Sequence, residues 1–133
     1  MKSDILIKDD MYNFIKGTPL SSSVSGKLCK TSIRPKGSKK EDIVISVIAN
    51  ENGQIQEAEV NVNIYVKDEI KSDGQNEEAT IRLRELCTIA SKALEVGSGD
   101  DYRFALKSQR VLANEETREH VINNRIYYKQ INE

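Results

Sequence analysis

The chain has 133 residues, of which 38% are hydrophobic and 31% charged. This length suffices for one ordinary domain, spanning residues 1–133, and is too short for two. Twenty Lys and Arg residues stand against 21 Asp and Glu, and the resulting net charge of −1 argues against a dedicated nucleic-acid-binding protein. No apolar run reaches the roughly 18 residues of a membrane span, and the first residues lack the features of a signal peptide. We therefore expect a soluble, intracellular protein that folds without disulfides or metals.

A short helix is predicted near the N-terminus. Residues 11–15 place four apolar side chains on one helical face, and Asp9 or Asp10 can serve as its N-cap. Gly17 and the Thr-Pro pair after it end the helix. The serine-rich stretch at residues 20–26 is predicted to be a loop with room for one helical turn.

Three strands are predicted to follow. The first covers residues 27–33, and a charged loop with a proline covers residues 34–40. Residues 41–49 are apolar on both faces, which is typical of a central strand. An Asn-Glu-Asn-Gly turn leads into a long strand at residues 54–66. The even positions of that strand from 58 to 66 are apolar and the odd ones mostly polar, so one face is buried and one is wet.

The second half of the chain is predicted to hold one long helix and two strands. Residues 67–76 form a polar, acidic loop, and residues 77–95 have the apolar spacing of an amphipathic helix, which the glycines after it end. Strands are predicted at residues 102–112 and 120–131, with a turn between them. The element order α-β-β-β-α-β-β predicts the α+β class: a mainly antiparallel sheet of about five strands with two helices packed on one face.

Residues suited to catalysis or metal binding are scarce. Cys29 and Cys87 belong to no metal-binding spacing and are predicted to be unpaired, small, buried side chains, with a disulfide or a reactive thiol as the alternatives. His120 is the only histidine, and its polar surroundings favour an ordinary surface position. The adjacent acidic pairs at 9–10, 77–78 and 100–101 lie at element boundaries, where acids cap helices or solubilise turns. We expect no enzyme activity, no cofactor and no metal.

The charges are unevenly distributed along the chain. Six basic residues and no acid lie between positions 27 and 40, whereas five acids and no base lie between positions 41 and 59. One interpretation is a solvated surface with patchy charge. The other is complementary edges, in which the basic loop of one copy meets the acidic strand of the next, with the wet strand face also in contact. The candidate contact residues are Lys27, Lys30, Arg34, Lys36, Lys39, Lys40, Glu57, Glu59, Asn61 and Asn63.

A double-stranded-RNA-binding domain is a third possibility, because the opening α-β-β-β-α order matches that fold. Such domains contact RNA with basic residues at the start of the second helix. Here that helix begins with Glu77 and Glu78, and Arg82 and Arg84 lie further in. Two more strands also follow it, so this reading is disfavoured.

The order of motifs resembles the tail-terminator and tail-completion proteins of long-tailed bacteriophages, the lambda-type fold family. The resemblance lies in pattern and order along nearly the whole chain. Its features are a short helix with MYNFI at 11–15, VSGKL at 24–28, Arg-Pro at 34–35, IVISV at 43–47, the alternating VNVNIYV at 60–66, ASKAL at 90–94 and RIYY at 125–128.

This resemblance implies a non-enzymatic structural subunit of a phage or prophage tail. Such proteins form a homo-oligomeric ring, commonly of six copies, that caps the finished tail tube and meets the head connector. The implied partners are further copies of the chain, the tail-tube protein and the head–tail connector, with no membrane and no specific nucleic acid. The implied location is the cytoplasm during assembly and then the virion tail. The alternative is a bacterial binding module of the same fold class.

Overall fold

The computed structural model describes residues 1–131, and over that range the chain forms three helices, a six-stranded sheet and a separate small hairpin. The helices are α1 (Asp4–Lys16), α2 (Pro19–Ser23) and α3 (Thr80–Leu94). The strands are β1 (Leu28–Cys29), β2 (Ile43–Glu51), β3 (Glu57–Lys67), β4 (Glu69–Ile70), β5 (Asn76–Glu77), β6 (Val96–Ser98), β7 (Tyr102–Asn114) and β8 (Glu119–Gln130). The predicted α+β class is confirmed, and the predicted five strands and two helices are close to these numbers.

The sheet has the strand order β1-β2-β3-β8-β7-β6, and every neighbouring pair is antiparallel except β1 with β2. β3 and β8 form its centre and pair over eleven positions, from Glu57 opposite Lys129 to Lys67 opposite Glu119. Successive side chains of a strand point to opposite faces, so the apolar even positions of β3 all enter one core.

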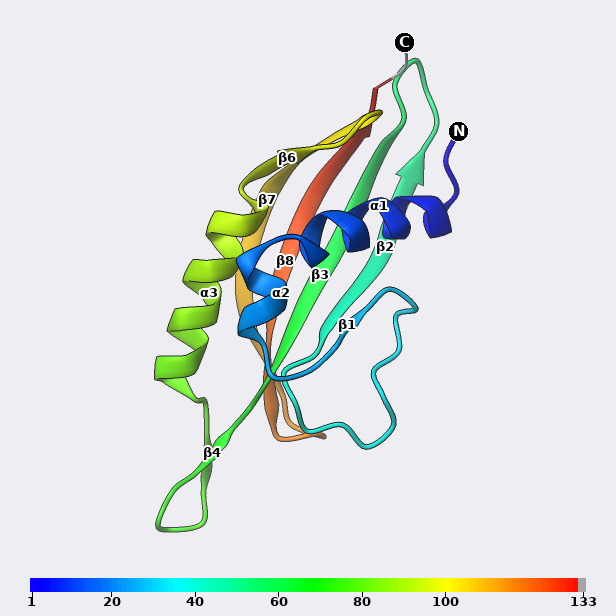
Figure 1. The fold of residues 1–133 in the computed structure, drawn as a ribbon. Helices are drawn as coiled ribbons and strands as arrows, with labels where there is room; N and C mark the ends of the chain where they lie inside the picture. The colour runs from blue at the N-terminus through cyan, green and yellow to red at the C-terminus, as the bar shows by residue number, and fades with distance from the viewer. Residues whose placement is uncertain (132–133) are drawn as a thin grey trace.

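All three helices cover one face of this sheet (Figure 1). α1 turns Ile7, Met11 and Ile15 into the core, at the four-residue spacing that repeats on one helical face. α3 contributes four buried side chains in the same way: Leu83, Leu86, Ala90 and Leu94. The opposite face of the sheet is covered by no helix of the described residues. None of the described helices is long and apolar enough to span a membrane.

The first helix is longer than predicted. α1 begins at Asp4 and is capped by Ser3, whose side-chain oxygen accepts a hydrogen bond from the Leu6 amide. Asp9 and Asp10 therefore lie inside the helix and do not cap it. The reason is that Ile7 extends the buried stripe of the helix by one turn. Its packing against the core stabilises the first turn of α1.

The predicted first strand is reduced to two residues. β1 pairs only Leu28 with Ile43 and Cys29 with Val44, in parallel. Ser32 has a φ of 64°, which a continuing strand does not allow. The chain leaves the sheet there because Arg34, described below, holds the rest of the segment in a loop.

The long helix starts later than predicted, and the loop before it is partly ordered. β4 and β5 pair as a hairpin, so Glu77 belongs to a strand and α3 begins at Thr80. The glycines after the long helix were predicted to end it, but Gly97 lies in the strand β6. A Cβ at Gly97 would overlap the rings of Phe14 and Phe104, and the closeness of these rings requires glycine there.

Candidate functional site

The acidic pairs of the sequence contribute carboxylates to ion pairs of the fold. No group of three or more His, Cys, Asp or Glu side chains in that range could hold a metal ion. Members of the acidic pairs bond to cations of the fold: Asp9 to Lys30, Asp10 and Asp101 to Lys2, and Glu77 to Lys71. These carboxylates therefore form ion pairs within the fold.

The histidine and the cysteines occupy structural positions. His120 lies in β8, and its Nδ1 is 2.6 Å from Asp68 Oδ1 at the base of the hairpin. Its ring is largely covered, in contrast to the expected surface position. Cys29 and Cys87 are both free, and both are half-buried where full burial was predicted. Burial raises the pKa of the Cys87 thiol, which disfavours the reactive thiolate.

Arg34 is an anchor inside the fold. Its guanidinium donates to both carboxylate oxygens of Glu119, at 2.7 and 2.9 Å, and to Asp42 at 2.9 Å. It also lies 4.2 Å from the centre of the Tyr65 ring and donates to the Lys40 carbonyl. Sequence reasoning predicted Arg34 as a partner contact, whereas these bonds all lie within the chain.

Asp42 completes this network and is itself almost wholly buried. Its carboxylate accepts hydrogen bonds from the Ser38 hydroxyl, the Lys27 amide and Arg34. Burial alone would raise the pKa of Asp42, but these hydrogen bonds outweigh it and hold the pKa below its usual value. The loop at residues 34–42 is thereby fixed in shape.

The fixed loop forms one wall of a surface groove with a volume of about 530 Å³. Three of the predicted contact residues, Lys27, Lys39 and Lys40, line it together with the backbone of Gly26 and Gly37. All three lysines are exposed, and none of them has an ion-pair partner within residues 1–131. We call this surface the lysine groove.

The other predicted bases lie elsewhere. Lys30 pairs with Asp9 at 3.0 Å and stands 5.0 Å from the centre of the Tyr12 ring, so it is bound to α1. Lys36 is exposed in the turn of the loop and does not line the groove. The structure therefore brings three of the six predicted bases together.

The predicted polar contact residues of β3 all lie on the uncovered face of the sheet. The Asn123 side chain of β8 donates to Asn61 and to Asn63, at 3.1 and 2.7 Å. Glu59 pairs with Lys107 of β7, and this pairing lowers the pKa of Glu59. The face is thus an ordered polar surface.

Sequence reasoning missed the cations of this face. Four cations of β7 and β8 lie on this face, because each is paired across the strands with a residue that points outward. They are Arg103, Arg110, Arg125 and Lys129. Within the described part of the chain, none of the four has an ion-pair partner, and the Arg125 Nε is buried without a hydrogen bond. In β8 the apolar residues Ile122, Ile126 and Tyr128 share one parity, and this is the signal that could have placed Arg125 and Lys129, of the other parity, on the outward face.

Both edges of the sheet are mostly open. β1 pairs with only the first two residues of β2, and β6 pairs with only three residues of β7. The outer edges of β2 beyond Val44 and of β7 beyond Ala105 have no strand partner within residues 1–131. Open edges of this kind are sites where a further chain can add to a sheet.

Comparison with known proteins adds no assignment. No protein-family model matches the chain, and no curated protein matches it.

Proposed function

We propose that this chain is a non-enzymatic structural subunit of a phage or prophage tail, which assembles with copies of itself into a ring. The observation that carries the proposal is the uncovered face of the sheet. Its amides are ordered, and four of its cations, Arg103, Arg110, Arg125 and Lys129, have no ion-pair partner among residues 1–131. A surface of this kind, flanked by two open sheet edges, supports a function in binding other protein subunits.

The ring would cap the tail tube and join it to the head connector, as the resemblance to tail-terminator proteins implies. The chain would then act in the cytoplasm during assembly and remain in the virion tail. The distribution of charge supports a head-to-tail arrangement, since the lysine groove and the acids Glu57 and Glu59 of β3 lie on different parts of the surface. In such a ring each subunit presents two different surfaces to its neighbours.

The test is electron microscopy of the purified chain mixed with tail tubes assembled from the tube protein encoded in the same genome. We expect rings seated at one end of the tubes, and tubes that stop growing when the chain is added. Tubes that keep growing, with bare ends at saturating concentrations of the chain, would overturn the proposal. A tube protein from an unrelated phage serves as the control, and its tubes are expected to remain uncapped.

A further inference from the structure

We propose that the hairpin segment at residues 68–78 of one copy docks into the lysine groove of the next copy. We call this segment the acidic arm. The inference deepens the proposed function and rests on it, because it names the contact through which ring subunits would join. It is carried by the exposure of the arm, by its charge and by the shape and charge of the groove.

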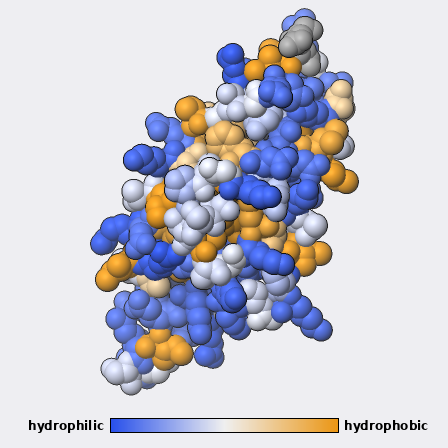
Figure 2. Space-filling view, viewed as in Figure 1, coloured by the Kyte–Doolittle hydropathy of each residue, from blue (hydrophilic) through white to orange (hydrophobic). Residues whose placement is uncertain are grey.

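The acidic arm projects beyond the end of the sheet and beyond the N-terminal end of α3 (Figure 1). It contains β4 and β5, which pair only with each other in the described chain. Ile70 on β4 has 69% of its surface exposed, and Figure 2 shows hydrophobic atoms on this projecting end surrounded by hydrophilic ones. A two-stranded hairpin without a covering layer is only marginally stable in water, so a partner surface would stabilise it.

The charge of the acidic arm specifies a cationic partner. It carries five acids and one base. Glu69 and Glu77 face each other across the two strands, and directly opposed like charges destabilise a hairpin. Lys71 pairs with Glu77 at 2.8 Å, whereas Glu69 has no cation within ion-pair distance among residues 1–131. A partner that supplies lysines beside Glu69 would relieve this repulsion.

The lysine groove has the matching properties. Lys27, Lys39 and Lys40 line it without ion-pair partners in the described chain, and Pro35 gives it an apolar wall. Ile33, in the same loop, has 73% of its surface exposed and offers an apolar contact for Ile70. The Arg34 network holds the loop in place, so that little ordering of the groove is needed on binding.

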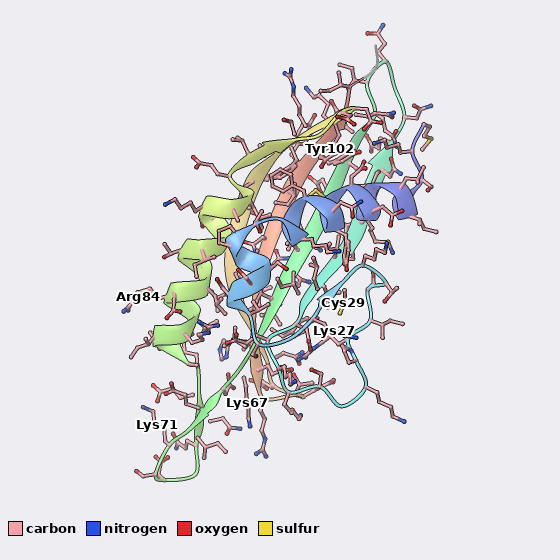
Figure 3. All side chains as sticks on the ribbon, viewed as in Figure 1. Lys27, Cys29, Lys67, Lys71, Arg84 and Tyr102 are labelled. Atoms are coloured by element: carbon pink, nitrogen blue, oxygen red, sulfur yellow. The ribbon has the colours of Figure 1, made fainter. Side chains whose placement is uncertain are left out.

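The two surfaces lie apart on one copy. Figure 3 shows Lys71 on the projecting arm, away from Lys27 beside the basic loop, and no residue of the arm lines the groove. The arm therefore does not fill its own groove, and docking must join different copies. A contact between two different surfaces repeats from copy to copy and can close into a ring.

Charge reversal with rescue tests this contact. One variant carries Glu69→Lys and Glu78→Lys in the arm, and the other carries Lys39→Glu and Lys40→Glu in the groove. Glu69→Lys places opposite charges across the hairpin, so the arm itself folds at least as well as before. A matched control, Glu51→Lys with Asp100→Lys, makes the same charge change at exposed positions near the opposite end of the sheet.

Self-association is measured by sedimentation at low salt and high protein concentration, with and without tail tubes. We expect each single-sided variant to associate at least about tenfold more weakly than the wild type, because like charges would meet at the contact. The four-substitution protein is expected to regain association, and the control is expected to match the wild type.

The outcomes separate the two proposals. If the wild type associates and both single-sided variants associate equally well, the docking contact is wrong while the ring stands. If the combined protein fails to recover although both single-sided variants are weakened, the arm and the groove do not meet each other and the docking contact is again wrong. If the wild type stays monomeric even with tubes, both proposals fall.

Discussion

Arg34 and Glu119 are 85 positions apart and form a two-pronged ion pair, with Nη1 to Oε1 at 2.7 Å and Nη2 to Oε2 at 2.9 Å. The pair ties the basic loop to the start of β8. Glu119 and Asp42, the two acidic partners, are each about 1% exposed. The guanidinium thus neutralises two buried carboxylates and sets the position of the loop that forms the lysine groove.

Replacing Arg34 is expected to destabilise the fold. Arg34→Ala leaves the buried Glu119 and Asp42 without their cation, and removing one partner of such a pair costs about 3 kcal/mol or more. Arg34→Lys keeps the charge but loses the forked geometry, so it should fall between alanine and the wild type. Urea unfolding measures both. Lys36→Ala, at an exposed position of the same loop, should change the free energy of unfolding by less than about 0.5 kcal/mol. Equal stabilities for Arg34→Ala and Lys36→Ala would contradict the anchoring role.

The stability of the protein should depend on Asp42 at low pH. The pKa of Asp42 in the fold lies below its ordinary value of 3.8. Its ionised form therefore contributes stability that is fully present above that ordinary value and is lost as the pH falls through the lower pKa of the fold. Asp42→Asn should be less stable at pH 7 and should lose less stability than the wild type below pH about 4. Denaturant unfolding over a pH series gives the comparison, and parallel pH profiles for the two proteins would refute it.

The packing of α1 on β7 should be sensitive to Gly97. A Cβ there overlaps the rings of Phe104 and Phe14, which meet edge to face with their centres 4.7 Å apart. Gly97→Ala is expected to lower the free energy of unfolding by about 1–3 kcal/mol, since overpacking displaces both rings. Gly53→Ala is the control, because its Cβ would make only an ordinary contact, 3.6 Å from the Ile55 carbonyl oxygen. Thermal unfolding of the two variants should rank Gly97→Ala clearly lower.

Cys29 and Cys87 should both be titratable as thiols. They are free in the structure, and they lie on separate elements, β1 and α3. A thiol reagent applied to freshly prepared, unfolded protein without reductant should report two thiols per chain. A count near zero would show that a disulfide forms in solution.

The strands with regular alternation were the part of the fold that sequence could predict. β3 alternates apolar and polar residues along nearly its whole length, and β8 keeps Ile122, Ile126 and Tyr128 on one parity, so their buried faces follow from the chain itself. The wet face holding Asn61 and Asn63 was predicted for the same reason. Short elements were poorly predicted, as β1 shows, because two residues carry too little pattern.

The site could be predicted only in part, because its form depends on contacts between distant residues. Six bases in one segment predicted a basic surface, but nothing local distinguishes Arg34, which is used inside the fold, from Lys39, which is exposed. The choice is made by Glu119 and Asp42, and Glu119 lies far along the chain. The acidic arm was predicted as a loop up to residue 76 and as the start of the helix at residues 77–78, since a hairpin of two-residue strands has no periodicity to detect.

The mass of the assembled protein is the most direct test of the central claim, that this chain is a ring-forming structural subunit. Native mass spectrometry of the purified chain, at high protein concentration and low salt, counts the copies in each species. We predict one closed species of fixed copy number, with six copies as the number that the resemblance implies, which dissociates to monomers as salt screens the contact. A monomer at every concentration, with no ring forming when tail tubes are added either, or an open-ended series of sizes, would contradict the account.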